Sequence, residues 1–365
     1  MFYAVIWICY LILASLALIG LKGITLNKNQ YLLLSSIVAI TLSLIVYEFG
    51  PEYSPDYDMF EDWYGRSKLE VFGESWVSLK DPAFYFMSRF FNWLGLSYDY
   101  MNFFFCLISI SSLMFLLRSE KFRRYIFVIL LVYYSRFYFV HDFTQVRFSV
   151  AIILSTIGYF LFSEDKYIKA FLLIIVAALF HISAVFCVIP LLCRLLPRKS
   201  LSMKIILVLL LSFIFLGLLV NPDVIINFFQ SIPIVYNRLL PYLNGAYGVK
   251  ATRIITTYFM LKFVILILVS TVLIVRKKDW EKEYIYLVYT VCISIILSVA
   301  FRSNDAIALR FVEYFAIFDI LFFIESFYFL NKNYLYKKIG MDVFGFGTIL
   351  LSIIWVLSSI KLFKG

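Results

Sequence analysis

Long hydrophobic stretches alternate with short polar segments along the whole chain, and this pattern predicts membrane-spanning helices. A helix needs about 20 apolar residues to cross the hydrocarbon core of a bilayer, with ~17 as a practical lower limit. Uninterrupted stretches of about this length occupy residues 2–21, 31–48, 100–117, 205–220, 255–275, 284–301 and 343–360. Shorter or charge-containing stretches occupy residues 125–140, 148–163 and 307–330. The pattern predicts an all-α polytopic membrane protein, a single integral domain over residues 1–365 with about ten transmembrane helices.

The basic residues between these stretches predict which loops face the cytoplasm, because cytoplasmic loops are enriched in Lys and Arg. Segments 118–124, 194–204 and 276–282 carry four Lys or Arg each, and segment 331–338 carries three. All four lie on one side only if the remaining apolar run, 170–193, enters and leaves the membrane by that side. Each limb would reach ~18 Å, too short for a ~30 Å core. We therefore predict a re-entrant hairpin over 170–193, with a single straight span as the alternative.

In this topology the N-terminus and the most polar loops face the outside of the cell. The first extracytoplasmic loop covers residues 49–98, and its first part, 49–81, has eight acidic and three basic residues. Its second part is too short to span and is aromatic on several sides. We predict an interfacial helix there, with Asp81 as its N-cap and Pro82 in its first turn. A second large extracytoplasmic loop covers residues 221–254.

Composition excludes several classes of function. The chain is 63% hydrophobic with a mean hydropathy of +0.91, which excludes a water-soluble protein. The net charge of +10 does not indicate a nucleic-acid partner, because the basic residues form short clusters between apolar stretches. The five cysteines lie in apolar runs, and the chain has only two histidines. We therefore expect neither a metal site nor another cofactor.

Polar residues that interrupt the hydrophobic pattern gather on the predicted outer side. The first loop contains an acidic pair, Asp56 and Asp58, with Tyr57 between them. These acids suit either a substrate site or an ordinary solvated loop. Tyr57 can stack on a sugar ring or belong to the aromatic belt of the membrane interface.

A second polar group, HDFTQVR, follows the predicted span 125–140. In a helix, His141 and Gln145 would share a face at i and i+4, as would Asp142 and Gln145 at i and i+3. Arg147 either anchors the end of a span or binds an anion. Anchoring is the weaker interpretation here, because arginine anchors are disfavoured on the outer side.

Ionisable residues inside the predicted spans complete the candidates. His181 lies in an uncharged run, where such a residue tends to line a functional cavity, although a structural histidine is the alternative. Arg310 precedes Glu313 by three residues, so the two can neutralise each other within a helix. Guanidinium groups can also surround an anionic head group bidentately. The candidates for such contacts to substrate are Arg136, Arg147, Arg302 and Arg310. Tyr314 and Asp81 are further candidates for substrate binding.

Taken in order, the segments that carry these residues resemble the EpsG-like branch of the Wzy-type polysaccharide polymerases. The segments are PDYDMF, DPAFYFMSRFFNWLG, TQVRFSVAIILSTIGYF, LFHISAVFCVIPLL and ALRFVEYF, and together they cover about residues 45–320. The family usually has Glu-Pro where this chain has Asp81–Pro82.

The resemblance implies a metal-independent glycosyltransferase of the bacterial cytoplasmic (inner) membrane, with a GT-C-like architecture and its active site on the extracytoplasmic face. It implies joining of undecaprenyl-diphosphate-linked oligosaccharide units into an O-antigen, a capsule or an exopolysaccharide. One lipid-linked glycan would be the donor and another the acceptor. The resemblance also implies a separate co-polymerase that sets chain length.

The same resemblance suggests a role for each candidate. Arg147, supported by Arg310 and Arg302, would stabilise the leaving diphosphate. Gln145 would hold a sugar hydroxyl or a phosphate oxygen. The acceptor hydroxyl needs a general base, for which His181 and Asp56 are alternatives.

Three other classes of membrane protein stay open at this point. A GT-C-type transferase that uses a polyprenyl-phosphate sugar also places acids in its first outer loop, but it adds one sugar and usually needs a divalent metal. An O-antigen ligase uses the same donor with another acceptor. A lipid-linked oligosaccharide flippase performs no chemistry and usually shows paired repeats, which are not visible in this chain.

Overall fold

The computed structural model describes residues 1–21, 26–74, 81–194, 257–276, 282–301, 313–333 and 337–363. Within these ranges every regular element is a helix. The chain divides into two compact units, the first formed by Met1–Cys187 with Asn331–Gly365 and the second by Val188–Leu330.

Four helices of the described part are long and apolar enough to cross a membrane, namely α1 (Phe2–Leu21), α2 (Lys28–Tyr53), α6 (Tyr98–Leu116) and α10 (Val146–Ser163). They coincide with four of the predicted hydrophobic stretches, which confirms an all-α membrane protein. The total of ten spans and the GT-C-like architecture stay predictions. The stretch 205–220 and the loop 221–254 lie outside the described residues.

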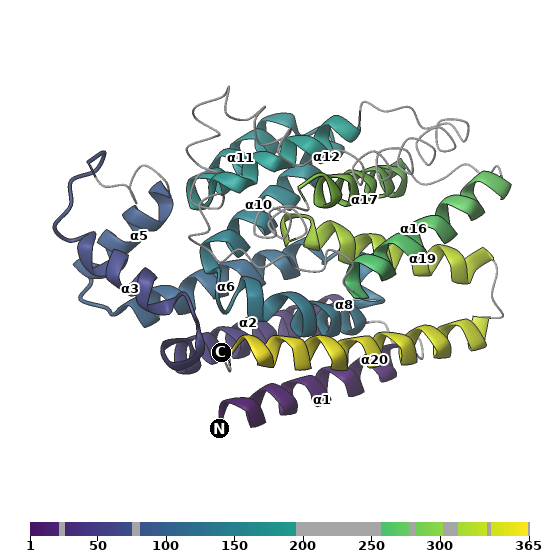
Figure 1. Ribbon diagram of the computed structural model, residues 1–365, viewed down its shortest axis with the longest axis horizontal. Coiled ribbons are helices and arrows are strands. Elements are labelled where there is room, and N and C mark those ends of the chain that lie inside the picture. Colours follow the sequence, from purple (N-terminus) through teal and green to yellow (C-terminus); the bar gives the residue numbers. More distant parts are fainter. Residues whose placement is uncertain are drawn as a thin grey trace. The chain divides into compact units, whose positions relative to one another are not determined.

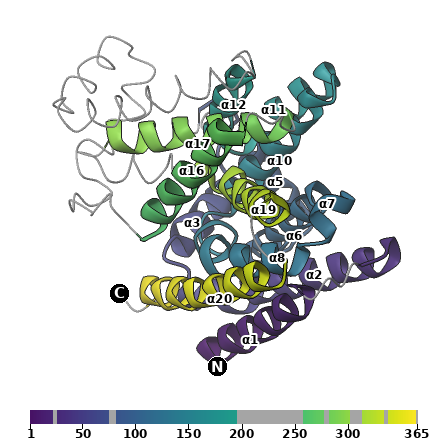
Figure 2. The same cartoon turned by 90° about the vertical axis from the view of Figure 1, so that its right-hand side faces the viewer.

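The first unit brings helices from both ends of the sequence together. α1 and α20 (Lys337–Leu362) run antiparallel, side by side (Figures 1 and 2). The Tyr10 hydroxyl lies 3.0 Å from the Ser352 hydroxyl and donates to the Ile349 carbonyl oxygen at 3.2 Å. The rings of Phe2 and Phe363 meet edge to face, with centroids 5.5 Å apart. Buried polar contacts therefore add to the apolar packing of these two helices.

The predicted span 125–140 is a composite of α8 (Ile126–Tyr133), the π-helix η1 (Tyr134–Tyr138) and α9 (Phe139–His141). A π-helix is wider than an α-helix and often occurs at functional sites. The hydroxyls of Tyr134 and Tyr138 donate to backbone carbonyl oxygens of α1 and α2, at 3.1 and 2.7 Å. These contacts hold the wide turn in place directly before the polar segment that follows it.

α10 is the most buried of the four long helices and packs against α6 and α11 (Tyr167–Phe180). Its close approach to α11 requires Gly158, because a Cβ there would lie 2.8 Å from the Ile174 side chain and 3.2 Å from the Ala170 carbonyl oxygen. Small residues allow helix backbones to approach in this way. The 3₁₀-helix η2 (Ile182–Cys187) joins them through a cluster of Ala151, Ala177 and Ala184.

The apolar run 170–193 is not one continuous helix. α11 ends at His181, whose extended backbone (φ −158°, ψ 129°) interrupts the helix before η2 and α12 (Val188–Cys193). The break falls at the middle of the segment predicted as a re-entrant hairpin. The path of this segment through a membrane stays a prediction.

The second unit contains α12, α16 (Thr257–Arg276), α17 (Lys282–Ala300) and most of α19 (Ala316–Asn333). The three long helices of its described part meet at a buried polar triad. The Lys262 ammonium of α16 donates to the Ser294 hydroxyl of α17 at 2.6 Å and to the Asp319 carboxylate of α19 at 2.8 Å. The side chains of Lys262 and Asp319 are 3% and 0% exposed. Each charge offsets part of the desolvation of the other, and the triad links the three helices.

Candidate functional site

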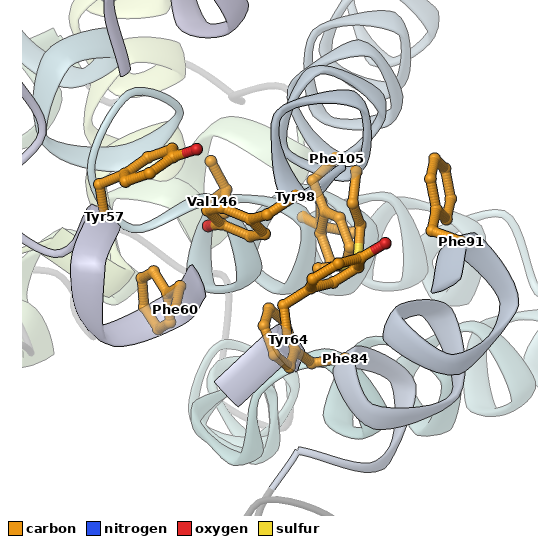
Figure 3. Packing of buried hydrophobic residues seen from close by; sticks show 10 residues of the cluster. Tyr57, Phe60, Tyr64, Phe84, Phe91, Tyr98, Phe105 and Val146 are labelled. Carbon is orange, nitrogen blue, oxygen red and sulfur yellow. The ribbon is translucent and has the colours of Figure 1, made fainter. Parts of the chain in front are cut away.

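An aromatic cluster attaches α3 (Tyr57–Arg66) and α5 (Pro82–Trp93) of the first loop to the first turns of α6 and α10 (Figure 3). Tyr64 donates its hydroxyl to the Leu96 carbonyl oxygen at 2.6 Å, and the Asn92 amide donates to the Tyr64 carbonyl oxygen at 3.0 Å. The loop is therefore a packed structure beside the spans. The buried side chains of the cluster include Tyr57, Phe60, Tyr64, Phe84, Phe91, Tyr98, Phe105 and Val146.

Arg147, in the first turn of α10, is enclosed by this cluster. Its guanidinium carbon lies 4.4, 4.9 and 5.1 Å from the ring centroids of Phe60, Trp63 and Phe84. The guanidinium also forms an ion pair with the Asp81 carboxylate, and the two side chains are 7% and 0% exposed. Aromatic faces and a carboxylate together offset the cost of burying the cation.

Asp81 stands at the N-cap position of α5, as predicted, but its side chain makes no capping hydrogen bond. The expectation that it caps the helix is therefore wrong. Its carboxylate pairs with Arg147 instead, which is the stronger interaction because both partners are charged. Pro82 follows Asp81 at the start of α5, where the fixed φ of proline is pre-organised for a helix.

The pairing leaves part of the Arg147 guanidinium available. A guanidinium has five N–H donors. Its Nε is buried and has no hydrogen-bond partner within the described part of the chain. An anion that reached this group could accept hydrogen bonds from it without first displacing Asp81.

Asp142 is the centre of a second buried polar network in the first unit. Its carboxylate accepts hydrogen bonds from the Tyr133 hydroxyl at 2.5 Å and the Ser149 hydroxyl at 2.6 Å. The Ser149 hydroxyl also lies 2.6 Å from that of Ser109 on α6. All four residues are buried. The network therefore joins α6, α8 and α10 to the turn that contains Asp142.

The predicted helical face shared by His141, Asp142 and Gln145 is wrong. Residues 142–144 form a turn between α9 and α10, and Gln145 occupies the N-cap position of α10. The predicted face required a continuous helix through these residues, and the turn interrupts that helix. The backbone N–H of Gln145 donates to the His141 carbonyl oxygen at 2.9 Å, which closes the turn.

Both histidines of the chain pack against the same ring. Phe148 lies edge to face with His141 and with His181, at centroid distances of 5.6 and 5.2 Å. Nδ1 of His181 lies 2.8 Å from the Ser183 hydroxyl and accepts the Ser183 backbone N–H at 3.3 Å. Since Nδ1 accepts a backbone donor, the proton of the neutral ring belongs on Nε2. His181 is half-buried at the break between α11 and η2.

Burial raises the pKa of the Asp142 carboxyl, in the turn between two helices, to about 6 from 3.8, although its hydroxyl partners lower it. Between these pKa values the native state binds more protons than the unfolded state, so the free energy of unfolding rises as pH falls. We expect the detergent-solubilised protein to gain about 1 kcal/mol between about pH 7.5 and 5, relative to Asp142→Asn. Thermal unfolding of both proteins at the two pH values measures this difference. Parallel pH profiles would contradict it.

The candidates of the first loop differ in their environments. The Tyr57 hydroxyl donates to the Asp99 carboxylate, which also accepts from the Ser97 hydroxyl at 2.9 Å. Burial and the Asp99 carboxylate raise the pKa of the Tyr57 phenol, so it stays protonated at neutral pH. Asp56, at the N-cap position of α3, is half-buried, and Asp58 is exposed.

The remaining candidates fall in other places. Arg136 is half-buried in η1, and its guanidinium carbon lies 5.2 Å from the centroid of Phe137. Tyr314 is buried in the second unit. Arg302 and Arg310 lie outside the described residues, so the predicted arginine cluster stays a prediction.

The structure adds partners that the sequence alone did not indicate. Lys262 was visible as a charge inside the predicted span 255–275, which is the signal that could have identified it. The hydroxyl partners of Asp142 gave no such signal, because serine and tyrosine are ordinary in these apolar runs. The missed residues are Phe60, Trp63 and Phe84 around Arg147, Tyr133, Ser109 and Ser149 around Asp142, and Lys262 with Ser294 and Asp319.

Comparison with known proteins identifies a family. The sequence model of the EpsG family covers residues 30–364 of the chain. No curated protein and no solved structure matches it.

Proposed function

Since the chain belongs to the EpsG family, which is associated with polysaccharide polymerisation in the membrane, we propose that it joins undecaprenyl-diphosphate-linked oligosaccharide units. One lipid-linked glycan is the donor, and the non-reducing end of another lipid-linked unit is the acceptor. The product is a surface polysaccharide that stays on its lipid diphosphate. We place the reaction on the extracytoplasmic face, where the positive-inside rule puts the first loop.

The observation that carries this proposal is the enclosed Arg147–Asp81 pair. Arg147 lies at the end of a span, beside a packed aromatic loop, with a donor that the described residues do not use. A lipid diphosphate would reach such a position from the bilayer and place its anionic group at the end of the helices. Aromatic side chains of the loop suit sugar rings, whose C–H faces are apolar. The arrangement therefore fits a diphosphate with a glycan attached.

In the proposed reaction the acceptor hydroxyl attacks the anomeric carbon of the donor sugar. The new C–O bond forms as the bond to the diphosphate oxygen breaks, and the diphosphate leaves with the electron pair. Arg147 stabilises the charge that develops on it, with Arg302 and Arg310 as further proposed donors, so the step needs no metal. A single displacement inverts the anomeric centre.

The hydroxyl proton passes to a carboxylate in this proposal, and Asp56 is its best candidate. Asp56 and Arg147 both interact electrostatically with the buried Tyr98 hydroxyl, so they belong to one electrostatic neighbourhood. His181 is less suited as the base, because its Nδ1 already accepts the Ser183 N–H. We assign to His181 a donor role toward a sugar or phosphate oxygen. We assign to Gln145 a polar contact with the same substrate.

Deletion of the gene in its native host, followed by restoration, tests the proposal. We expect deletion to collapse a ladder of surface polysaccharide to single repeat units that are still exported, and the wild-type gene to restore the ladder. Gel analysis of surface polysaccharide and of lipid-linked intermediates provides both measurements.

Each rival function gives a different outcome in this experiment. Long polymer stranded on its lipid would indicate a ligase, and single units trapped on the cytoplasmic leaflet would indicate a flippase. A repeat unit that lacks one sugar would indicate a transferase of single sugars. Any of these results would overturn the proposed polymerase.

A further inference from the structure

A cavity lies at the C-terminal ends of α6 and α10, away from the Arg147–Asp81 pair at the N-terminal end of α10. It has a volume of about 770 Å³ and is lined by the first turns of α2, the last turns of α6 and α10, and the segment around α7 (Glu120–Arg123). α10 advances ~20 Å from Arg147 to Phe160, and α6 advances ~27 Å from Tyr98 to Leu116. The cavity therefore lies almost one bilayer core, ~30 Å, away from the proposed catalytic site.

The charge of this cavity is positive. Lys28, Arg118 and Arg123 line it, against Glu164 as the single carboxylate among its lining residues. Glu164 already has a partner in Lys166, at 2.5 Å. The lining therefore holds three cations against one carboxylate, and its net charge is positive.

The two arginines are arranged for an anion. The guanidinium carbon of Arg118 lies over the Phe115 ring, 3.5 Å from its centroid, which holds the cation at the wall. Nε of Arg123 is buried and has no hydrogen-bond partner within the described part of the chain. Both arginines act electrostatically on the Tyr31 hydroxyl, so their charges converge on one part of the cavity.

The remaining walls are amphipathic. Hydroxyls of Ser111 and Ser119 lie among the lining groups, together with apolar side chains of Leu32, Ile157 and Leu161. Leu32 is 54% exposed on a helix long enough to span the membrane, so this wall continues onto a surface suited to lipid. A site with cations, hydroxyls and an apolar wall fits a molecule with an anionic head and a hydrocarbon tail.

We propose that this cavity binds the phosphate headgroup of an anionic lipid from the cytoplasmic leaflet. The positive-inside rule places the cluster 118–124 on that side, where anionic lipids attract basic segments. The phosphate contacts Arg118, Arg123 and Lys28, and the tail follows the apolar wall of α2. The site is separate from the proposed polymerase reaction and does not depend on it.

Lipid binding to the purified, delipidated full-length protein in detergent tests this site. The probes are phosphatidylglycerol, undecaprenyl phosphate and inorganic phosphate, each titrated against a fluorescently labelled protein. We expect the double variant Arg118→Gln/Arg123→Gln to raise the Kd for the preferred lipid at least about tenfold, because two charge-assisted contacts are lost. The control is Arg124→Gln, which removes one positive charge from the adjacent position that does not line the cavity.

A second variant keeps the charges and fills the space. Ser111→Trp narrows the cavity, and we expect it to weaken lipid binding while the fold and the charges persist, even if the double variant does not fold. The ratio of the two lipid affinities identifies the source of the phosphate headgroup. Equal effects of Arg124→Gln and the double variant, or unchanged binding in Ser111→Trp, would overturn the proposal. Inorganic phosphate that binds as tightly as either lipid would overturn the assignment to a lipid.

Discussion

Arg147→Ala is expected to abolish the polysaccharide ladder while single repeat units are still exported. The reason is the loss of the donor that stabilises the leaving diphosphate, a kind of loss that typically costs about 10²–10³-fold in rate. The measurement is the ladder of a host that carries only the variant gene, with the amount of protein in the membrane quantified beside it.

The variant also has a structural effect that must be separated from the chemical one. Removal of Arg147 leaves the Asp81 carboxylate buried without its cation, which typically costs about 3–5 kcal/mol of stability. The double variant Arg147→Gln/Asp81→Asn removes both charges at once and should reach the membrane in near-normal amount. We expect it to form no ladder.

A matched control comes from the same loop. Arg66 pairs with Asp62 at 2.8 Å, but their side chains are 62% and 49% exposed. An exposed pair contributes little, so Arg66→Ala should keep the ladder. A normal ladder from Arg147→Gln/Asp81→Asn would mean that the buried pair only holds the loop and has no part in the reaction.

Lys262→Met is expected to destabilise the protein by about 3–5 kcal/mol, because it leaves the Asp319 carboxylate buried without a cation. The Ser294 hydroxyl loses its charged partner at the same time. The measurement is the thermal midpoint in detergent, supported by the amount of monodisperse protein that remains after heating.

Two further variants test the physical reason for this loss. Lys262→Met/Asp319→Leu replaces both charges by apolar groups of similar size, and most of the stability should return, because no isolated charge stays buried. Lys361→Met removes a lysine that is exposed near the end of α20 and should change stability by at most about 0.5 kcal/mol. A double variant as unstable as Lys262→Met would show that the triad stabilises the unit through its specific hydrogen bonds.

The positions of the main helices could be predicted because they depend on local composition. The stretch 2–21 became α1 with the same bounds, and 148–163 lies within α10. A lipid-exposed backbone must satisfy its hydrogen bonds within the segment, so an apolar stretch of sufficient length has few alternatives to a helix. The helix start at Pro82 was predicted for the same kind of reason, since proline is pre-organised for that position.

The partners of the polar residues could not be predicted in this way. Asp81 has the sequence of a helix cap, yet its carboxylate turns to an arginine that follows 66 positions later in the chain. The helical face expected for His141 and Gln145 requires a continuous helix, but a turn over residues 142–144 separates them before α10. Pairings of this kind depend on which helices pack together, and one sequence does not contain that information.

The sequence by itself determined the membrane class, the places of the apolar helices and, through its ordered polar segments, the family. Those properties follow from hydropathy and from local residue order, which act over about one helix length. Only the tertiary structure decided that Arg147 is enclosed by Asp81 and three rings, and that Lys262 pairs with Asp319. A buried charge takes the partner that packing brings to it, because leaving it alone in a medium of low dielectric constant costs more than any local alternative.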